Sequence, residues 1–408
     1  MTTANPVVLN PIDPEFRKNP YPTYKRLLEE LPVHFTPFGV WAFVRYEDVR
    51  AILRDNKRFS SDDRKSPMYG ATQTMVSLPE GTDLSEEDRP FLFMDQPDHT
   101  RLRRLVNQAF SAKAVESLRP RVQEIVNELL DAAEAKGEMD AIGEFAYPLP
   151  VAVICEMLGV PKEDQPIFST WSEVLARSLD PDIALPPEEL KAREQAIKES
   201  RDYFRELVAV RRKNLGGDIL SALITAEDEG DKLSERELLS TCTLLLIAGH
   251  ETTVNLIGNG ILQLLRHPDQ LAKFQADPDL APSVVEEVLR FDPPVQLDGR
   301  ICIERTEIGG VTVEPGQFVM TPLGAANRDP AQFPDPERFD ITRGDDRHLA
   351  FGYGIHFCLG APLARIEGQI ALRTLIERCP KLRLLEEDVR YRDRFTLRGL
   401  AELRVGLS

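Results

Sequence analysis

Cysteine is scarce in this chain of 408 residues, and it has no long, uninterrupted hydrophobic run. The five cysteines are odd in number and widely spaced, without a Cys-x-x-Cys pair, so neither a disulfide framework nor a zinc site is indicated. The most apolar stretch, residues 238–265, contains His250, Glu251, Asn255 and Asn259 and falls short of the ~18 apolar residues that cross a bilayer. The first residues also lack the charged-then-apolar pattern of a signal peptide, so we expect a cytoplasmic protein without a membrane span.

Positive charge is also in short supply. The 50 lysines and arginines are outnumbered by 67 aspartates and glutamates, which leaves a formal charge of −17 and disfavours nucleic-acid binding. The sequence has no linker rich in glycine or serine, no internal repeat and no low-complexity tract. It therefore predicts one large domain over residues 1–408 that buries a substantial core.

Hydrophobic periodicity predicts a mainly α-helical body with a small β region. Alternating apolar residues around Gly39 predict a hairpin at 32–46, and a second β region is expected at 300–321, where glycines and Pro315 mark turns. A further helix is expected to begin at or just after Cys358. The other expected helices cover residues 21–30, 47–55, 99–109, 114–135, 149–157, 187–214, 234–266, 269–276 and 281–291.

Residues 351–360 read Phe-Gly-Tyr-Gly-Ile-His-Phe-Cys-Leu-Gly and place Cys358 at the mouth of an amphipathic helix. The free N–H groups and the positive dipole at the start of a helix favour the thiolate, which is the form of cysteine that binds metal. A lone cysteine is more often a small buried hydrophobe. However, the six specified positions of this segment would coincide by chance on the order of once in 10⁵.

This segment resembles the haem-binding loop of cytochromes P450, and the resemblance covers nearly the whole chain. It implies the triangular fold of that family, with a long central helix over the haem, and haem b whose proximal thiolate ligand is Cys358. It also implies that Phe351 shields the sulfur, that His356 reaches a haem propionate and that Gly360 belongs to the cofactor loop. Thiolate ligation suits oxygen activation because it pushes electron density towards iron and favours O–O cleavage.

A second chemical element lies in the middle of the apolar stretch, at Ala248-Gly249-His250-Glu251-Thr252-Thr253. Gly249 permits close approach of a ligand, and the Thr252 hydroxyl is expected to bond the carbonyl of Ala248 and open the turn. A buried structural Thr-Thr pair is the alternative. The segment resembles the oxygen-activating helix of the same family, which implies that Thr252 assists oxygen activation and that Glu251 starts the relay of protons from solvent. His250 is expected only to make a hydrogen bond.

Glu287 and Arg290 lie three residues apart on one face of an apolar helix. Such a pair is usually a surface ion pair that contributes little stability. In the family it is joined by an arginine from a Pro-x-Arg-Phe segment, which is matched here by Pro336-Glu337-Arg338-Phe339. The resemblance therefore implies a buried network of Glu287, Arg290 and Arg338 that pins the segment leading to Cys358.

Anionic propionates need cationic or hydrogen-bonding partners. His99 and Arg103 lie one turn apart on a predicted helix, and Arg300 follows Asp298-Gly299. The resemblance assigns these three residues, together with His356, to the propionates. A basic face in contact with water is the alternative, and it is the preferred interpretation for Arg101 and Arg104.

The resemblance also suggests residues that contact substrate, and most of them are apolar, as befits a pocket for a hydrophobic molecule. They are Met75, Val76 and Leu78 before His99, Leu244, Ile247 and Ala248 over the haem, Val295, Gln296 and Leu297, and Thr396 and Leu397. Several of them are alternatively plain core residues. The irregular stretch 177–187 is expected to be a mobile lid over the pocket.

These features predict a haem-thiolate monooxygenase that inserts one oxygen atom of O₂ into a hydrophobic small molecule, by hydroxylation or epoxidation. A terpenoid, steroid, fatty acid or polyketide-type metabolite fits this class. The chain has no Gly-rich dinucleotide fingerprint or cysteine cluster, so NAD(P)H electrons are expected through a ferredoxin and ferredoxin reductase, or a flavodoxin-type donor. A peroxide-using or non-oxidative haem-thiolate enzyme, or a haem sensor or carrier, is the alternative; the Glu251-Thr252 pair counts against the first of these. A monomer is expected.

Arginines in segments that the family places around the cysteine side of the haem predict a local basic patch on this acidic protein. Such a patch would attract an acidic ferredoxin by electrostatic steering. The alternative is that these arginines bind propionates or balance nearby acids. The residues concerned are Arg101, Arg103, Arg104, Arg343, Arg347 and Arg365.

Overall fold

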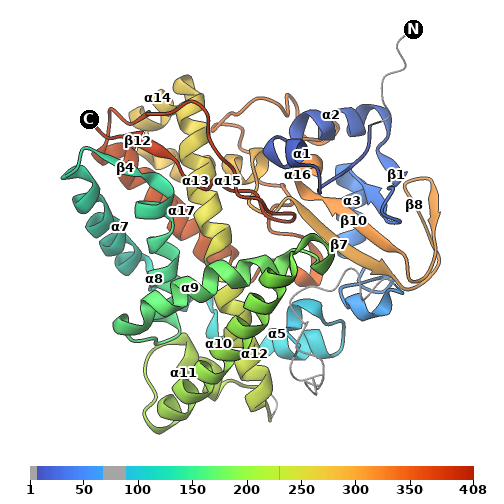
Figure 1. Ribbon diagram of the computed structural model, residues 1–408, viewed down its shortest axis with the longest axis horizontal. Helices are drawn as coiled ribbons and strands as arrows, with labels where there is room; N and C mark the ends of the chain where they lie inside the picture. Colours follow the sequence, from blue (N-terminus) through green and yellow to red (C-terminus); the bar gives the residue numbers. More distant parts are fainter. Residues whose placement is uncertain (1–6, 68–88, 229) are drawn as a thin grey trace.

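The computed structural model describes residues 7–67, 89–228 and 230–408, and helices dominate it (Figure 1). The α-helices are α1 Pro14–Lys18, α2 Tyr21–Glu30, α3 Tyr46–Arg54, α5 Asp98–Ala109, α6 Ala112–Glu116, α7 Arg119–Glu134, α8 Pro148–Met157, α9 Gln165–Ala176, α10 Pro187–Lys213, α11 Ile219–Thr225, α12 Glu235–Gly249, α13 Glu251–Arg266, α14 Pro268–Ala276, α15 Ala281–Phe291, α16 Leu323–Ala326 and α17 Ala361–Arg378. Short helical turns are η1 Asp63–Lys65, η3 Phe91–Phe93, η4 Ala141–Ala146, η5 Lys162–Asp164, η6 Arg177–Leu179, η7 Asp182–Ala184, η8 Pro278–Leu280 and η9 Gly354–His356.

Strands from both ends of the chain build one five-stranded sheet. The strands of this sheet and of the three smaller sheets in the described residues are β1 Val33–Phe35, β2 Trp41–Phe43, β3 Phe59–Ser60, β4 Glu138–Asp140, β5 Glu227–Asp228, β6 Asp231–Lys232, β7 Leu297–Cys302, β8 Thr306–Ile308, β9 Val311–Val313, β10 Phe318–Pro322, β11 Arg383–Leu384 and β12 Arg404–Gly406. The order β1-β2-β10-β7-β3 joins the predicted hairpin to the predicted second β region, and β2 with β10 is the parallel pair. Figure 1 shows this sheet with α1 to α3 on one side of the molecule and most helices on the other.

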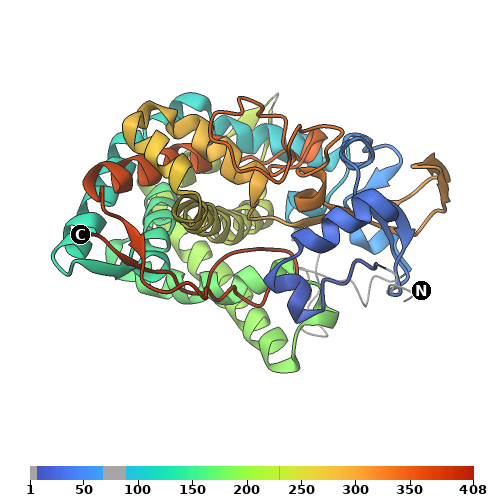
Figure 2. The ribbon, with the colours of Figure 1, turned by 90° about the horizontal axis from the view of Figure 1, so that it is seen from above.

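The predicted central helix is present as two helices that meet at His250. The residues of α12 and α13 are almost all buried, and α13 packs against α15, α17 and η4. Figure 2 views this region nearly end-on, with the other helices arranged around it. Among the described residues, no helix combines the length and apolar character that a bilayer crossing requires.

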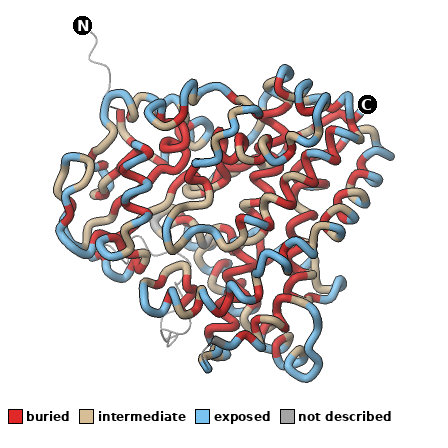
Figure 3. The backbone as a smooth tube through the Cα atoms, turned by 180° about the vertical axis from the view of Figure 1, so that it is seen from behind, coloured by how far each residue is buried: buried red, intermediate tan, exposed pale blue. Residues whose placement is uncertain are grey.

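The main hydrophobic core surrounds the central helices. Its buried side chains come chiefly from α7, α8, α12, α13, α15 and α17, and smaller clusters lie under the sheet and α2. Figure 3 shows the buried residues on the inner faces of the helices and the exposed residues at the periphery. The interior therefore presents a largely apolar environment to any polar group placed in α12 or α13.

The structure also differs from the predicted elements outside the central helix. The expected helix at 114–135 is divided into α6 and α7, because Pro120 lies in the first turn of α7, where proline is favoured. Helix α9 was not predicted, although it buries Phe168, Trp171 and Leu175. Helix α11, also unpredicted, is 7 residues long, which is too short for a helical period to emerge.

Candidate active site

The segment before α17 forms a tight loop around Cys358. The Cys358 N–H donates to the carbonyl of Phe351 at 2.9 Å. Gly352 and Gly354 have φ angles of 70° and 78°, in the left-handed region that favours glycine. A Cβ atom on Gly354 would lie 2.6 Å from the carbonyl oxygen of Leu53, so the loop packs directly against α3. Both glycines are therefore needed for the loop to adopt this shape.

The sulfur of Cys358 lies at the N-terminus of α17, whose N-cap residue is Gly360. Burial among protein groups raises the pKa of the Cys358 thiol, whereas the N–H groups of Gly360 and Ala361 and the charges of Arg103 and Arg365 act to lower it. Burial thus opposes the effect of the helix start on the thiol, and a metal ion that binds the sulfur would itself favour the thiolate. Cys358 is nevertheless exposed on one side, whereas the other four cysteines are buried.

Two histidines and two arginines form a positive cluster beside this loop. The rings of His99 in α5 and His356 in η9 are 4.1 Å apart. Arg103 donates to the Phe357 carbonyl at 2.7 Å, and Arg300 in β7 is buried. Burial, Arg103 and Arg300 lower the pKa of His99 to about 4. Burial, Arg300, His99 and Arg103 lower the pKa of His356 to about 2.

This cluster fits the propionate groups of haem. Both ring nitrogens of His99 and Nε2 of His356 are buried without a hydrogen-bond partner, and such groups require a partner. Asp298, 2.6 Å from Arg300, offsets the charge of that arginine, so the net positive charge of the cluster comes from Arg103, which bonds a backbone carbonyl. Within the described ranges, no group of three or more His, Cys, Asp or Glu side chains could hold a bare metal ion. The donor set, one thiolate with propionate partners, favours haem.

The turn between α12 and α13 borders an accessible space. Ala248 is exposed and Gly249 and Thr252 are half-buried, although the residues on either side of this turn are buried. The Thr252 hydroxyl donates to the Ala248 carbonyl at 3.0 Å, as predicted. At the Ala248 carbonyl this hydroxyl takes the place of a backbone N–H donor, which agrees with the interruption of the helix at His250. The turn therefore presents a hydroxyl group and a small residue to the space.

Glu251 is fully buried, and its carboxylate has a partner that the sequence did not reveal. Its two oxygens accept hydrogen bonds from Nη1 of Arg392 at 3.1 and 3.2 Å. His250 places Nδ1 3.1 Å from the Leu246 carbonyl, which is the hydrogen-bonding role expected for it. Arg392 lies 141 residues after Glu251 in a segment without periodicity, so no local signal could have identified it.

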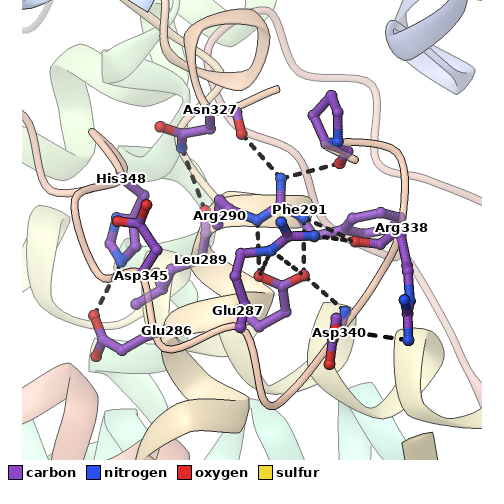
Figure 4. Close-up of polar contacts among 12 residues, drawn as sticks. Glu286, Glu287, Leu289, Arg290, Phe291, Asn327, Arg338, Asp340, Asp345 and His348 are labelled. Atoms are coloured by element: carbon purple, nitrogen blue, oxygen red, sulfur yellow. Dashed lines mark hydrogen bonds and ion pairs between the residues drawn. The ribbon is translucent and has the colours of Figure 1, made fainter. Parts of the chain in front are cut away.

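Glu287 and Arg290 form a buried pair in α15 (Figure 4). Arg290 donates from Nε and Nη2 to the two carboxylate oxygens of Glu287 at 2.7 and 2.8 Å. Its remaining donors bind the backbone carbonyls of Asn327, Pro336 and Arg338 at 3.0 to 3.1 Å. Through these backbone contacts, the pair holds in place the segment of chain that leads towards Cys358.

Arg338 is not the third charged member of this network, and that prediction was wrong. Its side chain is 60% exposed and lies 3.7 Å from Asp340, because the adjacent Phe339 takes the inward position. Arg343 supplies the second guanidinium instead. It is 12% exposed on its side chain, lies 3.3 Å from Glu287 and also binds the carbonyl of Arg338 at 2.8 Å.

Glu286, next to this pair, was not predicted and binds residues on both sides of the cysteine loop. It accepts hydrogen bonds from Nε and Nη2 of Arg365 at 2.6 and 2.8 Å, and His348 Nε2 lies 3.0 Å away. Burial raises the pKa of Glu286, but the hydrogen bonds from Arg365 and His348 outweigh it and lower the pKa to about 2. The guanidinium of Arg365 also lies 4.6 Å from the ring centroid of Phe351. Helix α15 is thus tied to both flanks of the loop.

The residues proposed to contact substrate fall in different surroundings. Met75, Val76 and Leu78 lie outside the described residues. Leu244 and Ile247 are buried in α12, and Val295 pairs with Leu397 in a β-bridge. The Thr396 hydroxyl donates to the Leu179 carbonyl at 2.8 Å, within the stretch expected to be a lid.

Gln296 and Leu297 belong to the fold rather than to a pocket, which corrects the prediction for both. The Gln296 amide donates to the Pro293 carbonyl at 2.8 Å, and its oxygen lies 3.3 Å from the Tyr24 hydroxyl. Leu297 is buried in the cluster under α2, together with Tyr24 and Leu27. Both side chains therefore face the N-terminal helices.

Most arginines of the predicted basic patch are paired with acids. Arg101 binds Asp231 and Glu237, Arg343 binds Glu287, Arg347 binds Asp345 and Arg365 binds Glu286. Arg104 remains exposed. Helix α3, which contacts the cysteine loop, carries Arg50 and Arg54 on its exposed surface, and Arg50 donates to the Tyr353 hydroxyl at 2.9 Å. A basic surface beside the loop therefore involves α3 more than the predicted set.

Comparison with known proteins agrees with this geometry. Residues 40–395 match the family model described as Cytochrome P450. Cytochrome P450 107B1 of Saccharopolyspora erythraea is 43% identical, covering 99% of both chains, and 6-deoxyerythronolide B hydroxylase of the same organism is 43% identical, covering 95% of this chain and 96% of that protein. The structure of the Bacillus subtilis polyketide synthase cytochrome P450 PksS superposes with a TM-score of 0.88 at 38% identity, covering 98% of this chain and 100% of that chain.

Proposed function

The chain belongs to the cytochrome P450 family, whose monooxygenases hold haem through a cysteine thiolate, and from that premise we propose how this member works. We propose that Cys358 is the thiolate ligand and that the enzyme inserts one oxygen atom of O₂ into a hydrophobic small molecule, by hydroxylation or epoxidation. The observation that carries the proposal is the interruption of the central helix at His250. It sets a buried carboxylate, Glu251, beside a partly accessible hydroxyl, Thr252, at a turn with an exposed face.

Haem bound through a thiolate supplies the activation of dioxygen. The residues that would hold it are Cys358 at the start of α17 and the group of His99, Arg103, Arg300 and His356 for its two carboxylates. Phe351, at the start of the cysteine loop, contacts the Arg365 guanidinium and the ring of Phe357 and would shield the sulfur. Glu286 and Glu287 hold that loop in place from α15.

The protein's contribution to the reaction is control of protons. Thr252 offers a hydroxyl that is held by the Ala248 carbonyl and is free to accept a further hydrogen bond. Glu251 is a carboxylate in an apolar helix, and through Arg392, whose side chain is 17% exposed, it lies close to solvent. A proton accepted from solvent by Glu251 can pass towards Thr252, while the surrounding apolar residues exclude bulk water.

The substrate we propose is a polyketide-type metabolite or an apolar compound of similar size. The support is twofold: Leu244, Ile247, Ala248, Val295 and Leu397 are apolar, and similar proteins carry names such as 6-deoxyerythronolide B hydroxylase and polyketide biosynthesis cytochrome P450 PksS. A structure of P450BioI, which is 40% identical to this chain, is a complex with acyl carrier protein ligated to hexadec-9Z-enoic acid. Carrier-bound acyl chains therefore belong in any substrate screen.

For electrons we propose a separate ferredoxin with its reductase, which docks on the surface formed by α3 and α5 beside the cysteine loop. Arg54 and Lys57 are exposed there and have no ion-pair partner in the part of the chain that the structure describes. Arg104 on α5 is also exposed. An acidic ferredoxin would be attracted to this local surface despite the negative charge of the whole chain.

The test is a reconstituted reaction. Purified protein, a surrogate ferredoxin and reductase, NADPH and ¹⁸O₂ are incubated with macrolactones and carrier-bound acyl chains, preselected for a shift in the haem spectrum. We expect a product that contains one ¹⁸O atom and requires both NADPH and O₂. Product formed with peroxide alone, or without ¹⁸O, would favour a peroxide-using or non-oxidative enzyme instead.

A substitution of Thr252, which removes its hydroxyl group, refines this test. Thr252→Ala should continue to consume NADPH, while product falls and peroxide rises, because the hydroxyl is needed after oxygen has bound. Thr253→Val, which removes the neighbouring hydroxyl in the buried part of α13, is the matched control and should stay coupled. Unchanged coupling in Thr252→Ala would remove this residue from the mechanism.

A further inference from the structure

The outer end of the proposed proton relay is held by a loop from the far end of the chain. We call residues 391–398 the C-terminal loop. Arg392 in this loop donates from Nη1 to both oxygens of Glu251, at 3.1 and 3.2 Å. Glu251 is completely buried, so this guanidinium is what compensates its charge. The position of Arg392 therefore bears directly on the ionisation of Glu251.

The C-terminal loop is anchored firmly to α13. The Asn259 amide donates to the Arg398 carbonyl at 3.1 Å. Arg392 is fixed twice more, because its backbone N–H donates to the Gly399 carbonyl at 2.9 Å and its Nε to the Leu400 carbonyl at 3.2 Å. The guanidinium thus approaches Glu251 from a backbone that is itself held against the same helix.

The opposite side of this loop binds the lid segment, residues 177–187. Oδ1 of Asp180, a buried residue, accepts hydrogen bonds from the backbone N–H groups of Phe395 and Thr396 at 3.0 and 2.9 Å. Arg177 donates to the Asp393 carbonyl at 2.7 Å and to Asp180 at 2.8 Å. Four hydrogen bonds, counting the one from Thr396 to the Leu179 carbonyl, thus join the lid segment to the C-terminal loop. The fifth, from Arg177 to Asp180, lies within the lid segment.

Arg394 interacts electrostatically with two buried carboxylates, those of Glu251 and Asp180. Its Nε is buried without a hydrogen-bond partner. Burial lowers the pKa of Arg394, and the negative charges of Glu251 and Asp180 act against that effect. One short loop therefore carries the partner of Glu251, the backbone donors for Asp180 and a second arginine within reach of both.

We propose that Arg392 is a positioning residue for Glu251, and that the C-terminal loop couples this pair to the lid segment. When the lid is docked through Asp180, the ion pair with Arg392 holds the Glu251 carboxylate in position to accept a proton from solvent. When the lid lifts, the loop loses its bonds to Asp180, and the hold of Arg392 on Glu251 weakens. Proton delivery is thereby favoured when the lid has closed over substrate. The inference deepens the proposed function and rests on its assignment of Glu251.

The groups that face Glu251 support this direction of effect. Arg392 and Arg394 approach from the C-terminal loop, His250 places Nε2 3.8 Å away, and Tyr147 from the start of α8 lies within electrostatic reach. Burial lowers the pKa of His250, and burial raises the pKa of Tyr147 to about 12, so both are uncharged near neutral pH. The arginines are therefore the groups that stabilise the carboxylate. Without Arg392, burial would favour the protonated acid.

The first experiment reads the protonation of Glu251 without turnover. The carboxylic-acid infrared band of haem-loaded protein is followed against pH in wild type, Arg392→Gln and Arg392→Lys, each with and without Glu251→Gln to identify the band. We expect the Glu251 acid band to appear at higher pH in Arg392→Gln than in wild type, because the carboxylate has lost its guanidinium partner, and to return towards wild-type behaviour in Arg392→Lys. Arg390→Gln, an exposed arginine two residues away, is the matched control.

The second experiment tests the coupling. Asp180→Ala removes the acceptor for the Phe395 and Thr396 N–H groups, so the Glu251 band should move in the same direction as in Arg392→Gln, by a smaller amount. Glu189→Ala is the control. It breaks the ion pair between Arg177 and Glu189, whose side chain is 40% exposed, and should leave the Glu251 band in place. An unmoved band in Arg392→Gln would overturn the positioning role, and an unmoved band in Asp180→Ala would overturn the coupling.

Turnover separates this inference from the proposed function. In an active enzyme, the acidic limb of the pH–rate profile of Arg392→Gln should shift upward with the infrared band, and the solvent isotope effect should rise. If the protein inserts no oxygen with any substrate, the proposed function fails while the infrared titration still decides the pairing of Arg392 with Glu251. If it inserts oxygen with an unshifted profile, the inference fails alone.

Discussion

Two adjacent glutamates of α15 point to different parts of the chain and together hold the cysteine loop. Glu287 faces Arg290 and Arg343, and Glu286 faces His348 and Arg365. Removing one partner of a buried ion pair leaves a charge without compensation, which costs more than the pair itself contributes. The residues that position Cys358 are therefore expected to be sensitive to single substitutions.

Arg343→Ala should destabilise the protein by about 1 to 3 kcal/mol and reduce haem incorporation, because Glu287 loses one of its two guanidinium partners. Arg338→Ala should be near neutral, since that side chain is 60% exposed and bonds to the fold through its carbonyl. Urea unfolding and the ratio of haem to protein measure both effects. Equal losses in the two variants would contradict the structure of this network.

Glu286→Gln should lose stability that depends on pH in a defined direction. The folded pKa of Glu286, about 2, lies below its unfolded value, so the carboxylate stabilises the fold fully above pH ~4.3 and less as the pH falls towards 2. At neutral pH the loss is on the order of 3 kcal/mol. Urea unfolding between pH 7 and pH 3.5 should show the gap between variant and wild type narrowing below pH ~4.5.

Glu314→Gln, in an exposed pair with Arg305, is the control for that measurement and should show almost no loss. A gap between Glu286→Gln and wild type that widens on acidification would mean that the Glu286 pKa is raised rather than lowered.

At this scale the sequence predicts residues that lie within a compact motif and misses those that act from a distance. Cys358, His356 and the pair of Glu287 and Arg290 stand in short patterns. Arg338 and Arg343 lie five residues apart in an irregular stretch, where no periodicity tells which side chain points inward. Arg392 is brought to Glu251 only by the folding of the C-terminal loop onto α13.

Among the elements, the contact between α13 and the C-terminal loop is unusually close. A Cβ atom on Gly399 would lie 1.7 Å from Oδ1 of Asn255, and both residues are buried. Gly399 directly follows the C-terminal loop, so a glycine is required at this position for the loop to lie against the helix. Because the C-terminal loop carries Arg392 and Thr396, its distance from α13 would affect both the proposed proton relay and the contact with the lid segment.

Gly399→Ala should therefore lift the loop, lower the stability by about 1 to 3 kcal/mol and weaken substrate binding. Adding Asn255→Ala removes the obstructing amide and should restore much of the loss, so the two substitutions will not be additive. Thermal unfolding and spectral titration with a binding compound measure the outcome. A double variant that is worse than either single one would show that the clash is not with Asn255.

Elements with strong periodicity are predicted well, and short or interrupted ones are not. The expected helices at 21–30 and 281–291 match α2 and α15 to the residue. The central helix is predicted as one piece because hydrophobic burial continues across His250, whereas the backbone breaks there. The five-stranded sheet could be predicted only as two separate regions, since the pairing of β2 with β10 is a tertiary contact.

On the scale of the whole molecule, the overall negative charge does not describe the surface beside the cysteine loop. The chain carries a formal charge of −17, yet exposed arginines and a lysine lie on and after α3 beside the cysteine loop. Electrostatic steering by such a local patch is screened by salt, because the Debye length falls from about 10 Å at 0.1 M to about 3 Å at 1 M.

Reduction by ferredoxin should therefore slow as the ionic strength rises. Arg54→Glu should weaken ferredoxin binding several-fold without changing the affinity for substrate. Lys191→Glu, at an exposed position on α10, is the matched control and should behave as wild type. Stopped-flow reduction at several salt concentrations measures the rates. Salt-independent reduction, with Arg54→Glu silent, would place the donor elsewhere.

The most direct test of the whole account is the spectrum of the reduced, carbon monoxide-bound protein. Wild type should show the red-shifted band of a thiolate-ligated haem, and Cys155→Ser, at a buried core cysteine, should retain it. Cys358→Ser should bind haem without that band, because the sulfur at the start of α17 has gone. A red-shifted band that persists unchanged in Cys358→Ser would show that another residue holds the iron.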